Sequence, residues 1–262
     1  MPFQKVERVI YNKNPLDNVI CQLRFPPILT IDSEIPASFQ NAIRDEFPAY
    51  KETLEFQQEI SSGLQLNGQS EIVNPLSNII LNKNHSFESE DGVWKINLTR
   101  TFLSISTSKY TRWEEFKGMF QKPLLALKQF YNPPFFTRLG LRYVNIFCRS
   151  KLDLKDIQWS ELIHQQFLGI LASEVKDSVN EFTSACEIRL ADEISSVRII
   201  TALVQNLELE KCFMIDNDFY TPSKIKFEDV DEKLDFINER STRLIKYIVK
   251  PKLHDAMEAR KI

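Results

Sequence analysis

Glycine and histidine are scarce in this sequence, and each shortage disfavours one kind of chemistry. Glycine supplies only 6 of the 262 residues, although loops that cradle phosphate need it where the backbone approaches the ligand. No Gly-Ser dipeptide, Walker A motif or Gly-x-Gly-x-x-Gly pattern occurs. The histidines His85, His164 and His254 form none of the spacings typical of a metal site. We therefore expect no cofactor, and an enzyme that holds nucleotides in glycine-rich turns is disfavoured.

Cysteine pairs and long apolar runs are missing too. The four cysteines, Cys21, Cys148, Cys186 and Cys212, form no Cys-x-x-Cys motif, and we expect buried free thiols in a reducing compartment. No apolar run approaches the roughly 20 residues that a membrane-spanning helix needs. The segment Met1–Lys13 also lacks the apolar core of a signal peptide. The predicted location is therefore the cytoplasm, without membrane contact.

Phenylalanine is abundant, and the charge is nearly balanced. The chain has 19 phenylalanines and 43% hydrophobic residues, which predicts a packed, aromatic-rich core. The net charge of −3 gives no overall attraction to nucleic acid. Nucleic acid is therefore not the expected partner.

Alternating apolar and polar residues predict short strands joined by tight turns. Val93–Leu98 and Phe102–Thr107 should form an antiparallel hairpin, and Thr137–Phe147 should be a central strand. Three later segments are strand-like: Ala185–Ala191, Val197–Gln205 and Lys211–Tyr220. Because the connections between these three are short, they should form an antiparallel meander.

Helical spacing of apolar residues predicts three longer helices, at Tyr110–Tyr131, Trp159–Val175 and Glu228–Met257. Pro123 should kink or divide the first helix, and Pro251 should bend the last. Clusters of strands followed by helices indicate an α+β fold, mainly antiparallel sheet with long amphipathic helices packed on one face. We expect an N-terminal α+β half, residues 1–150, and a C-terminal α+β half, residues 151–262. A divergent duplication is an open alternative, although no residue-level repeat is visible.

Four motifs together resemble a sporadically distributed family of bacterial proteins of similar length. The residues that carry the resemblance are Pro15-Leu16, Val19 and Phe25; Phe39-Gln40 and Phe47-Pro48; Tyr110, Trp113 and Phe116; and Arg138, Gly140-Leu141-Arg142-Tyr143 and Asn145. The resemblance is good from residue 15 to about residue 147 and weaker beyond. It implies no established activity. Its patchy distribution would fit a mobile-element or antiphage-defence setting, with the protein as an accessory or antitoxin-like subunit.

Arg138, Gly140 and Arg142 form the candidate anion site. Side chains two residues apart on a strand share a face, so the two arginines flank the side-chain-free position of Gly140. One interpretation is a carboxylate or phosphate held between the two guanidinium groups. The other is that both arginines pair with acidic residues of a neighbouring element. Tyr143 and Asn145 point to the opposite face, where we expect them to be polar anchors in the core.

Two further clusters are weaker candidates. Asp216 and Asp218 share one strand face and could hold Mg²⁺ or Mn²⁺ in an enzyme acting on a nucleotide or phosphate ester, or they could form salt bridges. A basic cluster on the last helix could contact nucleic-acid phosphates, or it could be a solvated helix face. Its residues are Arg240, Arg243, Lys246 and Lys250.

The sequence contains no recognisable catalytic motif, so we predict a non-enzymatic binding or partner protein. A protein partner or self-association is expected, and a small anionic ligand is an alternative occupant. The metal-dependent enzyme and the nucleic-acid-binding protein remain the competing hypotheses.

Overall fold

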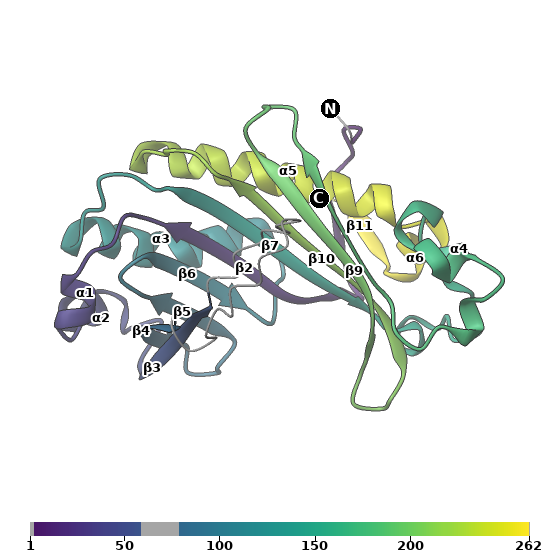
Figure 1. Ribbon diagram of the computed structural model, residues 1–262, viewed down its shortest axis with the longest axis horizontal. Helices are drawn as coiled ribbons and strands as arrows, with labels where there is room; N and C mark the ends of the chain where they lie inside the picture. Colours follow the sequence, from purple (N-terminus) through teal and green to yellow (C-terminus); the bar gives the residue numbers. More distant parts are fainter. Residues whose placement is uncertain (1–2, 59–78, 262) are drawn as a thin grey trace, which may run out of the picture.

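A single antiparallel sheet of nine strands forms the centre of the protein (Figure 1). The computed structural model describes residues 3–58 and 79–261. Across the sheet the strands are β3 (Ala49–Gln58), β4 (Ile79–Glu88), β5 (Trp94–Leu98), β6 (Phe102–Thr107), β2 (Leu16–Arg24), β7 (Arg138–Phe147), β10 (Lys211–Thr221), β9 (Ser196–Gln205) and β8 (Thr183–Arg189). The predicted α+β class with an antiparallel sheet is confirmed, as are the hairpin β5–β6 and the meander β8–β9–β10.

The helices pack against one face of this sheet. The two long helices, α3 (Trp113–Phe130) and α5 (Val230–Ile248), lie beside each other (Figure 1). Two hydrogen bonds join them, since Asp235 of α5 accepts from Trp113 Nε1 at 2.7 Å and from Lys117 Nζ at 3.0 Å. The shorter helices are α1 (Thr30–Ser33), α2 (Ala37–Ile43), α4 (Trp159–Leu162) and α6 (Pro251–Ala256). Only α2, α3 and α5 reach seven residues in the described part of the chain. No described helix has the length and apolarity needed to cross a membrane.

The core lies between the sheet and these helices. Alternate residues of the central strands point into it, as shown by Leu139, Leu141 and Tyr143 of β7, which are all buried, whereas the edge strand β8 has no buried residue. On the helix side, Phe116 and Phe120 of α3 are also buried. An antiparallel sheet covered on one face has polar residues on its other face. The abundant phenylalanine therefore serves the predicted aromatic core.

Strand β7 is central, as predicted. Antiparallel partners flank it on both sides, with Leu141 opposite Cys21 of β2 and also opposite Phe219 of β10. Because β7 links strands from before and after residue 150, one continuous sheet runs across the expected boundary between the halves. The division into residues 1–150 and 151–262 stays a prediction.

The order of elements repeats along the chain. Strand β2 is followed by short helices, a meander ending in β6 beside β2, and then the long helix α3. Strand β7 is followed by short helical turns, a meander ending in β10 beside β7, and then the long helix α5. The two central strands β2 and β7 pair with each other. A separate two-stranded ladder joins β1 (Val9–Tyr11) to β11 (Ala259–Lys261), which the sequence did not suggest.

The predicted helix Trp159–Val175 is wrong. Helix α4 ends at Leu162, and short 3-10 turns replace the rest. The chain is extended at Ile163, which forms a β-bridge with Val249. Gly169 then takes a positive φ of 50°, a conformation that glycine adopts without strain. The helical spacing of apolar residues thus arises from a chain of turns packed on the core.

Proline acts differently at the two predicted positions. Helix α3 runs unbroken through Pro123, which is buried, so a division of the helix there is wrong. The last predicted helix is interrupted more strongly than expected. It ends at Ile248, Val249 is extended, and Pro251 begins the separate helix α6. Proline is favoured at a first helical position because its missing N–H would have no partner there.

Candidate functional site

A polar face, defined as the side of the sheet opposite the helices, carries the candidate anion and metal residues together. The register places Arg142 of β7 opposite Asp218 of β10, and Asp218 opposite Arg198 of β9. On the other side, Arg24 of β2 lies opposite Arg138 of β7. Among the described residues, no helix covers these side chains, since the helices pack on the apolar face.

The Arg142 guanidinium forms a two-pronged pair with Asp216. Its Nε donates to Oδ1 at 2.7 Å and its Nη2 donates to Oδ2 at 2.6 Å. The Asp216 side chain is only 6% exposed, whereas the Arg142 side chain is 46% exposed. These hydrogen bonds raise the pKa of Arg142. The buried carboxylate therefore depends on a half-exposed arginine for its neutralisation.

Arg138 pairs with Asp218 across the position of Gly140. Its Nη2 donates to Asp218 Oδ2 at 2.7 Å, and its guanidinium stacks over the Tyr220 ring at 4.9 Å from the centroid. A Cβ atom on Gly140 would lie 2.3 Å from Arg138 Nη1, so the missing side chain makes room for this arginine. Burial raises the pKa of Asp218, against the lowering effect of the nearby arginines. The two predicted clusters, the arginines of β7 and the aspartates of β10, thus form ion pairs with each other across the strands. This arrangement matches the interpretation in which the arginines pair with acidic residues of a neighbouring element.

Arg24 and Arg198 also belong to the polar face and were missed in the sequence. Arg24 is exposed and its Nε donates only to neutral Gln22, at 2.9 Å. Partial burial and the positive charge of Arg138 lower the pKa of Arg24, against the raising effect of the Asp218 carboxylate. The Arg198 side chain is exposed and forms no hydrogen bond or ion pair with any described residue, although Glu187 of β8 lies opposite it in the register. Only the strand order places these arginines beside Arg138 and Arg142, so local sequence patterns could not reveal them.

Most of the basic cluster near the C-terminus is engaged within the protein. Arg240 and Arg243 both pair with Glu239, and Arg240 also lies over the Phe236 ring, 3.4 Å from its centroid. Lys250 Nζ donates to the backbone carbonyl of Ser160 at 2.6 Å. Of the four, only Lys246 has a side chain that forms no hydrogen bond or ion pair with a described residue. Nucleic-acid binding by this cluster stays a prediction.

Cys148 and Cys212 form a disulfide, which corrects the prediction of four free thiols. The register that pairs Phe147 with Phe213 places these cysteines opposite each other at the ends of β7 and β10. Their Cα atoms are 4.5 Å apart, the spacing of a non-hydrogen-bonded antiparallel pair. Cys21 is free and buried, as predicted, but Cys186 is free and exposed. Because two of the four cysteines form a disulfide, free thiols no longer support a reducing compartment. The cytoplasmic location stays a prediction.

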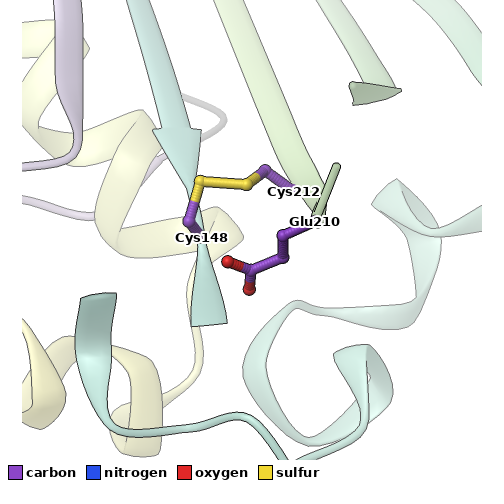
Figure 2. Close-up of side chains that lie close together, drawn as sticks. All are labelled: Cys148, Glu210 and Cys212. Atoms are coloured by element: carbon purple, nitrogen blue, oxygen red, sulfur yellow. A yellow bond between two sulfur atoms is a disulfide. The ribbon is translucent and has the colours of Figure 1, made fainter. Parts of the chain in front are cut away.

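Glu210 lies next to this disulfide, with its carboxylate below the sulfur–sulfur bond in the view of Figure 2. The ligand atoms of the three side chains lie within 4.8 Å of one another. Since the two sulfurs are bonded to each other, neither is a thiolate that could bind a metal ion. The Glu210 carboxylate accepts hydrogen bonds from the backbone N–H and the hydroxyl of Ser150. The disulfide therefore joins the end of β7 to the start of β10, and Glu210 binds the turn that follows β7 through Ser150.

Comparisons with known proteins add no identification. No protein-family model matches the chain, and no curated protein matches it. The resemblance to a sporadically distributed bacterial family stays a prediction that rests on the motifs alone.

Proposed function

We propose that this chain is a non-enzymatic binding protein that recognises an acidic segment of a partner protein through its polar face. The observation that carries the proposal is an excess of positive charge at the centre of that face. Four arginines, Arg24, Arg138, Arg142 and Arg198, face three carboxylates there, those of Asp216, Asp218 and, at the edge strand β8, Glu187. The whole chain, by contrast, has a net charge of −3.

The pairing within this face favours binding over chemistry. Each aspartate already has a guanidinium partner at 2.6–2.7 Å, so a metal ion would have to displace an arginine. A general acid or base also needs access to a substrate proton, whereas Asp216 is buried beneath Arg142. Among the described residues, no carboxylate forms an ion pair with the side chain of Arg24 or Arg198, so both can pair with carboxylates from outside.

The wider setting is part of the same proposal. An accessory or antitoxin-like role in a bacterial defence or mobile-element context rests on the family resemblance alone. The repeated order of elements supports a further proposal that the two halves arose by duplication, with long amphipathic helices as equivalent elements. In that case the pairing of β2 with β7 is the junction between the two copies.

The test removes the two unpaired arginines. The tagged double variant Arg24→Gln/Arg198→Gln and the wild type are used to purify partners from host cells. Each candidate partner is then purified and titrated calorimetrically at two salt concentrations. We expect the variant to bind the partner at least about tenfold more weakly than the wild type, because two charge-assisted contacts are lost. The salt dependence of its affinity should also be smaller.

A matched control removes two charges elsewhere. Arg44 at the C-terminal end of α2 and Lys109 in the turn before α3 are exposed and lie outside the polar face. The variant Arg44→Gln/Lys109→Gln should bind the partner like the wild type. Equal affinity of both double variants for every partner, or a chain that stays monomeric and binds none, would exclude the proposal.

A further inference from the structure

A cavity of about 100 Å³ lies on the opposite side of the sheet, among the helices. It is bounded by β1, the segment before α3, the strands β7 and β10, and the helix α5. Its walls include the rings of Tyr110, Trp113 and Tyr143. An engineered apolar cavity of about 150 Å³ holds one benzene molecule. This cavity is therefore on the scale of a single small ring, or of a few water molecules.

Besides Asn14, which lies before β2, three carboxamides from the sheet and a long helix line this cavity: Asn145 of β7, Asn217 of β10 and Asn238 of α5. Asn217 is 2% exposed, and its Oδ1 has no hydrogen-bond partner among the described residues. An unpaired buried polar atom costs about 1–3 kcal/mol, and such atoms are rare in folded proteins. A ligand or an ordered water that donates to Oδ1 would remove this cost.

The other two carboxamides are only partly used. Asn145 Nδ2 donates weakly, at 3.4 Å, to the carbonyl of Ile215, and Asn238 Oδ1 accepts from the Tyr143 hydroxyl at 2.9 Å. Tyr143 and Asn145 are thus the polar anchors of the core that the sequence predicted. The structure pairs neither Oδ1 of Asn145 nor Nδ2 of Asn238 with another described residue. Acceptors and donors therefore both remain available around Asn217.

The deep wall of the cavity is uncharged. Its titratable groups are tyrosines, and burial raises the pKa values of Tyr110 and Tyr143 well above the ordinary value, so their hydroxyls stay neutral. Positive charge occurs among the lining residues only at Arg8, which pairs with Glu114 at 2.8 Å, and at exposed Arg112. A neutral group with its own hydrogen-bond donors and acceptors fits this environment, whereas a buried charge would remain unpaired.

We propose that the cavity binds a small planar molecule whose edge carries an N–H donor beside a carbonyl acceptor, the edge of a pyrimidine nucleobase. A carboxamide such as Asn217 presents the complementary acceptor and donor and can form two parallel hydrogen bonds with such an edge. Paired bonds of this kind from Asn or Gln are a recognised way to read a base. The aromatic side chains contact the ring, as in other proteins that bind unpaired bases.

Free uracil and uridine are the probes, since the same edge occurs on a free base and on a nucleoside. Each is titrated into the purified full chain by calorimetry and by saturation-transfer NMR, with 1,3-dimethyluracil as the chemical control. Dimethyluracil keeps the ring and the carbonyls but has no N–H donor. We expect uracil, uridine or both to bind, and the control to bind at least about tenfold more weakly.

Two variants separate a ligand role from a structural one. Asn217→Leu removes the unpaired amide at similar volume, so it should leave the stability unchanged or raise it while weakening uracil binding at least about tenfold. Asn217→Ser keeps a polar group if the leucine variant fails to fold, and it too should bind more weakly. Asn180→Leu, at an exposed loop position outside the cavity, should bind like the wild type.

Three results would overturn the proposal: no binding of uracil or uridine, equal binding of dimethyluracil, or unchanged affinity in the Asn217 variants. The first would mean that the cavity holds only water. None of these results bears on recognition by the polar face, because that face lies on the other side of the sheet and its test uses different residues.

Discussion

Reduction of the Cys148–Cys212 disulfide should destabilise the protein substantially. The two cysteines are 64 residues apart in the sequence, and in the chain-entropy model closing a loop of that length stabilises the folded state by about 4 kcal/mol. For a chain of this size, that loss corresponds to a drop of roughly 10 °C in the thermal midpoint. Urea unfolding followed by tryptophan fluorescence, with and without dithiothreitol, measures the difference.

The control and the thiol count make this prediction specific. The variant Cys148→Ala/Cys212→Ala should unfold at the same urea concentration with and without reductant. In denatured but unreduced protein, two thiols should react with Ellman's reagent, those of Cys21 and Cys186. In the native protein Cys186 should react first, because burial raises the pKa of Cys21 and the thiolate is the reactive form. Four reactive thiols in the unreduced protein, or stability indifferent to reductant, would refute the reasoning.

Three further predictions concern the charged groups. Arg142→Met should destabilise the protein by about 2–4 kcal/mol in urea unfolding, because it leaves the buried Asp216 carboxylate unpaired. Asp216→Asn should destabilise it less, by about 1 kcal/mol, because the half-exposed Arg142 side chain can turn to water. Equal losses of stability in the two variants would contradict this argument. Burial acts to raise the pKa of Asp192, but hydrogen bonds from the hydroxyl and backbone N–H of Ser195 outweigh it and lower that pKa. The stability that Asp192 contributes is therefore present above about pH 4 and lost as the pH falls through the lowered pKa. The variant Asp192→Asn should be less stable than the wild type at neutral pH, and the two stabilities should converge in acid. A stability difference that does not change with pH would argue against this. Calorimetric titration with Mg²⁺ or Mn²⁺ should give no saturable heat, because arginines occupy the carboxylates of Asp216 and Asp218; saturable binding that Asp216→Ala abolishes would restore the metal-enzyme hypothesis.

Local patterns in the sequence predicted the strands well because strand alternation is a short-range signal. The hairpin β5–β6, the central strand β7 and the meander β8–β9–β10 all follow it. Helical spacing, another short-range signal, failed at Trp159–Val175, where the apolar residues of several short turns recur as they would on a helix. There, contacts with a distant segment decide the backbone, since Ile163 bridges Val249 and the His164 N–H bonds the carbonyl of Ile248.

The candidate site shows the same division between local and distant information. Spacing placed Arg138 with Arg142, and Asp216 with Asp218, each pair on one strand face. That these two strands are neighbours, and in which register, depends on the sheet topology. The disulfide, the ion pairs and the arginines of β2 and β9 all follow from that topology. For this reason neither the cysteine pairing nor the excess of positive charge was visible in the sequence.

The pairing of β2 with β7 also has a consequence for how the chain folds. Each half contains a meander whose strands are close in sequence, whereas β2 and β7 lie on opposite sides of a long intervening segment. Pairings that close long loops form late and slowly. Until they form, the innermost strand of each half is an unpaired sheet edge, and such edges promote aggregation. A half expressed alone would keep that edge permanently. The two strands that pair at the centre of the complete sheet, β2 and β7, are therefore also the strands most prone to misassembly during synthesis.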